Sequence, residues 1–181
     1  MTGGHLMMFV PATTLTIGGL FVGMAIPIWH VARFAVSHLK KRGAILEDAK
    51  DLIPLAAGIG YGGLATATTS GVIGFATGAI TWLGNSAGSL AMWGATGGHS
   101  TLAARSNAAS LTGMGNLVLL LITVAILGAW KAIPQTARPH MRQGIVSGAL
   151  LGLSATLGGA FAAFVIPVAN SWGSSLVGSI A

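Results

Sequence analysis

Histidine and carboxylate side chains, which most often move protons or bind metals, are few in this chain, and the three carboxylates, Glu47, Asp48 and Asp51, all lie in one short loop. The histidines are scattered, with no pair at i and i+4 and no carboxylate partner close in sequence. Cysteine is absent, which removes thiolate nucleophiles and Cys-based metal sites. Nothing therefore resembles a metal site or an acid–base pair, and we expect neither enzyme activity nor a cofactor. The histidines are His5, His30, His38, His99 and His140.

Hydroxyl residues are unusually dense between positions 66 and 81. In an oligomer these side chains could line a wet, uncharged passage. Serine and threonine in membrane helices also donate to a carbonyl of their own helix, so both interpretations stay open here. The candidate pore-lining residues are Thr66, Thr69, Ser70 and Thr77.

Small residues repeat at four-residue spacing in several segments. Such a row drifts slowly across one face of a helix and lets a second backbone approach closely. Single pairs are explained by packing within one chain, but several rows together favour contacts between copies, and we expect a homo-oligomer. The candidate packing residues are Gly144, Gly148, Gly152 and Thr156 in one row, with Gly58, Gly62, Gly74 and Gly78 in shorter ones.

Basic residues gather in two short segments. These residues first indicate how the chain is oriented in the membrane, because Lys and Arg are retained on the cytoplasmic side and contact lipid headgroups there. Several copies could also arrange them into a cytoplasmic ring that attracts DNA or an acidic protein. The residues of this patch are Lys40, Lys41, Arg42, Lys131, Arg138 and Arg142.

The elements that would carry these residues follow from the distribution of charge. Segments 1–32, 52–104, 106–130 and 143–181 contain no Asp, Glu, Lys or Arg, and only 7% of the chain is charged. A water-soluble surface cannot be built from such stretches, which predicts an all-α membrane protein forming one domain over 1–181. The predicted membrane helices are 6–36, 52–83, 111–130 and 144–168, joined by loops 37–51 and 131–143, with a Gly-rich outer or re-entrant segment 84–110 and an outer tail 169–181.

Orientation follows from the same charges. Four spans place both basic loops in the cytoplasm and both termini outside the plasma (inner) membrane, whereas a fifth span over 85–104 would turn Lys131, Arg138 and Arg142 outward. No Asp or Glu falls within a predicted span, which argues against a carrier coupled to protons or sodium.

In its general character the chain resembles the hydrophobic spread (Spd-type) membrane proteins of actinobacterial conjugative plasmids. The likeness consists of a small polytopic chain rich in Gly, Ala and Thr, short basic inner loops and no catalytic residues. The resemblance implies a membrane component of intercellular DNA transfer, working as an oligomer with a DNA-translocating ATPase or with DNA at the cytoplasmic face.

The sequence thus favours a non-enzymatic oligomeric membrane protein that forms a channel or a scaffold in a transfer or secretion assembly. A phage-type holin or other lesion-forming protein is one alternative, because it also needs self-associating apolar helices and a basic cytoplasmic side. An uncoupled small-solute transporter is another.

Overall fold

The chain is helical in the computed structural model, which describes residues 14–40, 45–68, 71–103, 111–154 and 157–180. The prediction of an all-α protein is confirmed for these residues, to which a single two-residue strand pair adds little. In chain order the elements are β1 (Leu15–Thr16), α1 (Ile17–Lys40), α2 (Ile45–Ala65), α3 (Gly71–Thr96), β2 (Leu102–Ala103), α4 (Gly113–Ala129), α5 (Ala137–Gly152) and α6 (Leu157–Ile180). The strands pair antiparallel, with Leu15 opposite Ala103.

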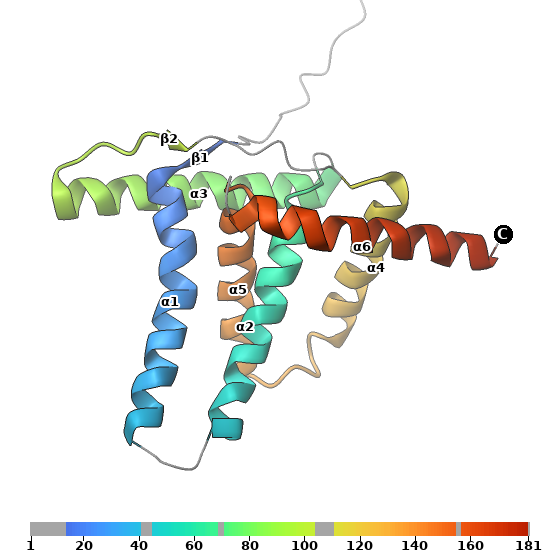
Figure 1. The fold of residues 1–181 in the computed structure, drawn as a ribbon, viewed down its shortest axis with the longest axis horizontal. Helices are drawn as coiled ribbons and strands as arrows, with labels where there is room; N and C mark the ends of the chain where they lie inside the picture. The colour runs from blue at the N-terminus through green and yellow to red at the C-terminus, as the bar shows by residue number, and fades with distance from the viewer. Residues whose placement is uncertain (1–13, 41–44, 69–70, 104–110, 155–156, 181) are drawn as a thin grey trace, which may run out of the picture.

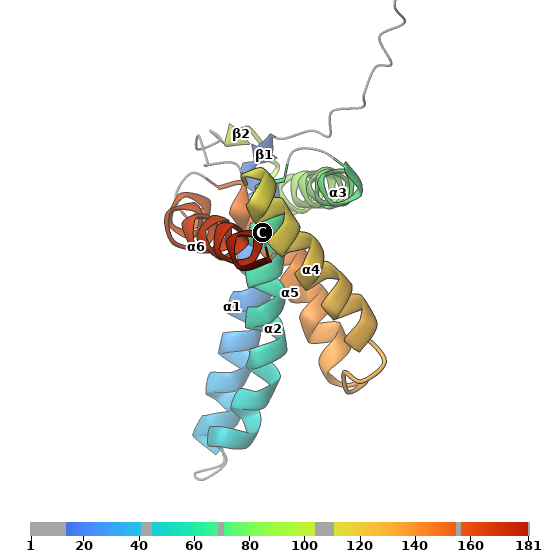
Figure 2. The same cartoon turned by 90° about the vertical axis from the view of Figure 1, so that its right-hand side faces the viewer.

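The helices form an upright group and a transverse group. Figure 1 shows α1, α2, α4 and α5 upright, with α3 and α6 lying across one end and running in opposite directions. Figure 2 places α3 and α6 on opposite faces of the upright helices. Among the contacts between elements, α2 packs mainly on α5, α1 on α3 and α5, and α4 on α6. The ends of α1 and α4 and the starts of α2 and α5 point away from α3 and α6, toward the end of the molecule that we call the basic end.

Two structural repeats account for this arrangement. In each repeat one helix descends to the basic end, a second returns, and a third crosses the far end, as α1, α2 and α3 and then as α4, α5 and α6. The sequence retains a trace of the duplication, because residues 85–89 read Asn-Ser-Ala-Gly-Ser and residues 170–174 read Asn-Ser-Trp-Gly-Ser. Both segments lie within the transverse helices.

Transverse helices α3 and α6 correct two predicted elements. A continuous helix over 52–83 does not form, because α2 ends at Ala65 and α3 starts at Gly71 in a new direction. Gly71 has φ +75°, a left-handed conformation that glycine adopts without steric cost and that ends the upright direction of the chain. The predicted helix 144–168 divides in the same way between α5, which ends at Gly152, and α6, which begins at Leu157.

Other predicted boundaries also move. The outer segment 84–110 is helical as far as Thr96, and the predicted tail 169–181 is helical as far as Ile180, because Pro167 lies inside α6 instead of ending it. The loops 37–51 and 131–143 are shorter than predicted, since α1 extends to Lys40 and α5 starts at Ala137. Predicted helix 111–130 agrees closely with α4.

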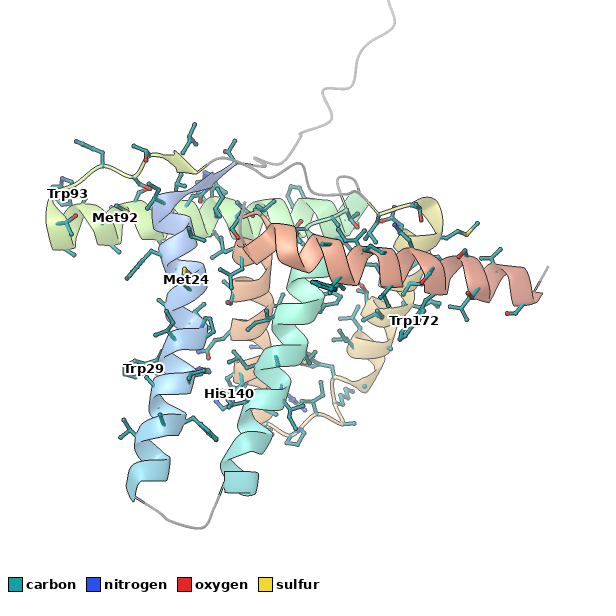
Figure 3. All side chains as sticks on the ribbon, viewed as in Figure 1. Met24, Trp29, Met92, Trp93, His140 and Trp172 are labelled. Atoms are coloured by element: carbon teal, nitrogen blue, oxygen red, sulfur yellow. The ribbon has the colours of Figure 1, made fainter. Side chains whose placement is uncertain are left out.

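By length and composition, one helix of the described chain can cross a membrane, α1 over Ile17–Val36. Shorter apolar helices are Leu52–Ala65 within α2 and Gly113–Ala129 in α4. The outer side of α1 is exposed, and Figure 3 shows Trp29 pointing away from the other helices. Apolar surface on this scale needs a covering of lipid or protein.

Candidate functional site

The glycine rows form a seam between α2 and α5. A methyl group at Gly58 would meet the Met141 carbonyl oxygen, and one at Gly144 would meet the Leu55 carbonyl oxygen. The next turn repeats the relation, since Gly62 faces the Ile145 carbonyl and Gly148 faces the Ile59 carbonyl. Such reciprocal contacts are those of two parallel helices related by a local twofold axis along the seam.

This seam changes the meaning of the predicted packing residues. Gly58, Gly62, Gly144 and Gly148 all contact the facing helix of the same chain, and Gly152 contacts Gly63 and Thr66. These rows are therefore occupied within one copy and are not available to join copies. Of the remaining candidates, Gly74 is buried on α3, Gly78 is half-buried, and Thr156 lies outside the described residues.

Two of the four candidate pore-lining residues donate to a carbonyl of the preceding turn of their own segment. Thr66 Oγ1 donates to the Gly63 carbonyl oxygen at 2.7 Å, and Thr77 Oγ1 donates to the Gly74 carbonyl oxygen at 3.0 Å. Hydroxyls bonded in this way do not present a polar wall to a passage. Thr69 and Ser70, the other two pore-lining candidates, lie outside the described residues.

Each repeat is locked by an asparagine of its transverse helix. Asn85 Oδ1 accepts hydrogen bonds from the backbone N–H of Thr16 at 3.0 Å and from its hydroxyl at 3.1 Å. Asn170 Oδ1 accepts the equivalent pair from Thr112, at 3.0 Å and 2.9 Å. We call these two contacts the asparagine clamps. They fix the transverse helices to the starts of α1 and α4, where unpaired backbone N–H groups need acceptors.

The contact of α1 with α5 and the contact of α2 with α4 occupy equivalent places in the two halves. The side chains that make these two contacts differ in size. On one side Ser147 Oγ of α5 donates to the Gly23 carbonyl oxygen of α1 at 2.7 Å. On the other side Tyr61 of α2 stands where α5 has Ser147, and its hydroxyl bonds Thr123 Oγ1 of α4 at 2.9 Å. Because a tyrosine is much larger than a serine, α4 lies farther from α2 than α1 lies from α5. The close contact of α1 with α5 exists in one half only.

At the basic end the cations have different tasks. Arg138 is half-buried and donates from Nε to the Ile133 carbonyl oxygen at 3.0 Å and from Nη2 to the Lys131 carbonyl oxygen at 3.1 Å, so it holds the turn between α4 and α5. Arg142 is exposed with its guanidinium 5.3 Å from the centre of the Trp130 ring, a cation–π distance. Lys131 is exposed. Lys40 is the last residue of α1, while Lys41 and Arg42 lie outside the described residues.

Two histidines that are far apart in sequence meet between α1 and α5. The rings of His30 and His140 lie edge to face, with their centres 5.1 Å apart. His30 Nε2 and His140 Nδ1 are both buried and have no hydrogen-bond partner among the described residues. Beside His30 an open groove of about 250 Å³ runs along α1, with Gln143 of α5 at its edge; its apolar lining is Phe21, Val22, Ala25, Ile26 and Trp29.

Sequence reasoning missed this pair because it searched for histidines that are neighbours in one helix. The contact depends on α1 packing against α5 of the second repeat, and the spacing of residues within one helix does not predict such packing. The duplicated Asn-Ser-x-Gly-Ser segments were the available signal, since they imply equivalent helices and a packing axis between them. Comparison with protein-family models, with curated proteins and with solved structures found no match.

Proposed function

We propose that the chain is an integral membrane protein whose copies assemble into the scaffold or channel of a transfer or secretion machine, without enzyme activity. The observation that carries this proposal is the apolar exterior of a fold whose polar groups turn inward. On α3, Thr77 and Thr81 are buried, while Trp82 and Trp93 are more than 60% exposed. A helix in water has the opposite pattern.

In this proposal α1, α2, α4 and α5 cross the membrane and α3 and α6 lie within its outer part. The 17 residues of α4 span about 25 Å, which is short for a hydrocarbon core of about 30 Å. A transverse helix adds about 10 Å of apolar thickness, so α4 and a transverse helix together measure about 35 Å, enough to cover the core. No charge occurs in α3 or α6, as a position inside the bilayer requires.

The basic end then faces the cytoplasm and both termini lie outside. Because the chain has no cysteine, single cysteines can test this without background. We expect a membrane-impermeant maleimide to label a His99→Cys variant in intact cells, and a Lys131→Cys variant only after the membrane is permeabilised. Both positions are exposed in the structure. The reverse pattern of labelling would refute the orientation.

Contacts between copies are assigned to the transverse helices, since the glycine seam is closed within each copy. Figure 3 shows Trp93 near the end of α3 and Trp172 on α6. These two helices extend to opposite sides of the molecule. Leu90 and Trp93 are 70% and 65% exposed. A passage, in this proposal, lies between copies, because the centre of one copy is filled by the seam.

Native mass spectrometry of the protein in lipid nanodiscs tests this assembly. We expect several copies per particle, and fewer for a variant that carries both Leu90→Ser and Trp93→Ser. A Trp29→Ser variant is the matched control, because Trp29 is equally exposed but lies on α1, away from the ends of α3 and α6. Single copies of the natural protein in lipid, with no cross-linked species in native membranes, would refute an assembly.

In this proposal a DNA-translocating ATPase or DNA docks at the basic end. Lys131 and Arg142 are exposed and lie at or beside the turn between α4 and α5, where they can meet it, whereas Arg138 is bonded within that turn. Co-purification of the partner at low salt should be lost for a Lys131→Gln, Arg142→Gln variant, and equal recovery would exclude this docking site.

The internal duplication favours one second candidate, an uncoupled small-solute transporter. Parallel repeats related by an axis along the membrane normal occur in several transporter folds. Solute entry into vesicles containing the purified protein would support this function over a scaffold, and vesicles that stay impermeable to a panel of small solutes would exclude it.

A further inference from the structure

We propose that the groove along α1 is a lipid site, which holds one acyl chain of an anionic phospholipid of the cytoplasmic leaflet while Arg33 binds the lipid phosphate. This inference rests on the membrane position proposed above and adds a specific lipid partner to it. Four properties of the groove support it: its lining, the bond that joins its two helices, its length, and the cation on the same helix face.

The lining of the groove matches a hydrocarbon chain. Apart from His30 and Gln143, the residues that line it are apolar. The groove is open along the outer side of α1, where Phe21 and Trp29 are 57% and 68% exposed. In a bilayer such a surface faces acyl chains, and a groove makes more contacts with one chain than a flat helix face does.

The two helices of the groove are joined by a hydrogen bond that compensates for Pro27. Proline has no N–H, so the Gly23 carbonyl four residues earlier loses its partner within α1. Ser147 Oγ of α5 donates to that carbonyl oxygen instead, at 2.7 Å. Ser147 lies one turn from Gln143 on the same face of α5, so the bond lies near the groove. Helices joined in this way hold the groove open before a lipid binds, which lowers the entropy cost of binding.

The length of the groove matches one leaflet of a bilayer. From Phe21 to His30, α1 rises about 14 Å. One leaflet contributes about 15 Å, which is half of a hydrocarbon core of about 30 Å. An acyl chain whose headgroup lies at the basic end can therefore follow the whole groove.

Arg33 continues the groove face of α1 toward the basic end. It follows Val22, Ile26 and Trp29 by eleven, seven and four residues, spacings that keep residues on one face of a helix. Arg33 is exposed. In the proposed orientation it lies at the cytoplasmic surface of the bilayer, because it is as far along α1 as Ala129, the last residue of α4, is along its own helix. A guanidinium at this depth binds a lipid phosphate through charge-assisted hydrogen bonds.

The second repeat has no such cation. Pairing Thr16 with Thr112, as the asparagine clamps do, sets Arg33 against Ala129 and His30 against Ile126. The equivalent face of α4 is apolar throughout and offers no donor to a phosphate. We therefore expect one anionic lipid per chain.

Native mass spectrometry of the full-length protein in detergent, with lipid added, tests the site. We expect one phosphatidylglycerol to be retained per chain, and phosphatidylcholine with the same acyl chains to bind about tenfold more weakly, because its choline group offsets the phosphate charge. Arg33→Gln should reduce phosphatidylglycerol binding to the phosphatidylcholine level. Arg142→Gln is the matched control, because it removes the same charge at the basic end from a guanidinium that lies over Trp130.

A second pair of variants tests the groove itself. Ala25→Trp fills the middle of the groove and should weaken the binding of both lipids, whereas Met24→Trp, on an exposed side of α1 outside the groove, should leave binding unchanged. Full binding by Ala25→Trp would overturn the groove as the place of the acyl chain.

The comparison of the two lipids uses the natural protein and so does not depend on a variant folding. Equal affinity for phosphatidylglycerol and phosphatidylcholine, or full phosphatidylglycerol binding by Arg33→Gln, would overturn the role of Arg33. The cysteine labelling described above tests the membrane position separately. A chain that is labelled as expected but retains no lipid would therefore overturn the lipid site alone.

Discussion

Replacing Gly62 by alanine tests the seam between α2 and α5 most directly. The added methyl group would lie against the Ile145 carbonyl oxygen, 2.8 Å from Ala149 N and 3.1 Å from the Ile145 carbonyl carbon. All three atoms are backbone atoms, so no side chain can rotate away and the two helices must separate. Over-packing of this kind costs about 1–3 kcal/mol of unfolding free energy.

Helix propensity acts in the opposite direction. Alanine is preferred to glycine inside a helix by about 1 kcal/mol, so the net loss for Gly62→Ala is about 0–2 kcal/mol. Gly60→Ala is the matched control, because Gly60 lies in the same helix and has no atom within 4 Å of its added methyl group. This variant should gain about 1 kcal/mol. The two substitutions are expected to differ by about 1–3 kcal/mol.

Equilibrium unfolding of both variants in mixed micelles measures that difference. The local twofold axis adds a second requirement, since Gly148→Ala faces the Ile59 backbone as Gly62→Ala faces Ile145 and should lose a similar amount. If Gly62→Ala proves as stable as Gly60→Ala, then the helices do not touch at this point and the seam is wrong.

Three further changes test other contacts by thermal unfolding. Asn85→Ala removes an acceptor of two hydrogen bonds and should cost about 1–2 kcal/mol, whereas Ser86→Ala, on the exposed side of α3, should be nearly neutral; equal effects would contradict the clamp. Tyr61→Phe should cost about 1 kcal/mol through loss of the bond to Thr123, and an unchanged melting temperature would show that α4 is not held there. Arg138→Lys should also lose about 1 kcal/mol, because an ammonium group cannot reach two carbonyls as a guanidinium does, and full stability would refute its role in the turn.

Charge and hydropathy predict the position of a helix well where polar residues mark the ends of that helix. The position of α4 was foreseen because Lys131 follows a strongly apolar run. The breaks after Ala65 and Gly152 were missed because the apolar character continues across them. The direction of the chain after α2 and after α5 is decided by backbone conformation, as at Gly71, and by the docking of α3 and α6. Composition predicts neither the backbone conformation nor the docking.

The residues of the site were partly visible in the sequence. Glycine spacing identified the atoms of the seam but not their partners, because a row of small residues fits a helix of the same chain and a helix of another copy equally well. Asn85 lies in the segment 84–110 that the sequence predicts to be outer or re-entrant, and its amide oxygen bonds Thr16 at the start of α1. The His30–His140 pair depends wholly on tertiary packing.

The packing of α1, from the first repeat, against α5, from the second repeat, has a consequence for biosynthesis. The hydrogen bond from Ser147 to the Gly23 carbonyl oxygen joins residues 124 positions apart. At about 5–20 residues per second, α1 waits roughly 6–25 s after its own synthesis before α5 emerges from the ribosome. During that interval the part of α1 around Gly23, whose final neighbour is α5, is not yet covered by it. The newly made first half therefore exposes this part of α1 until the second half has been synthesised.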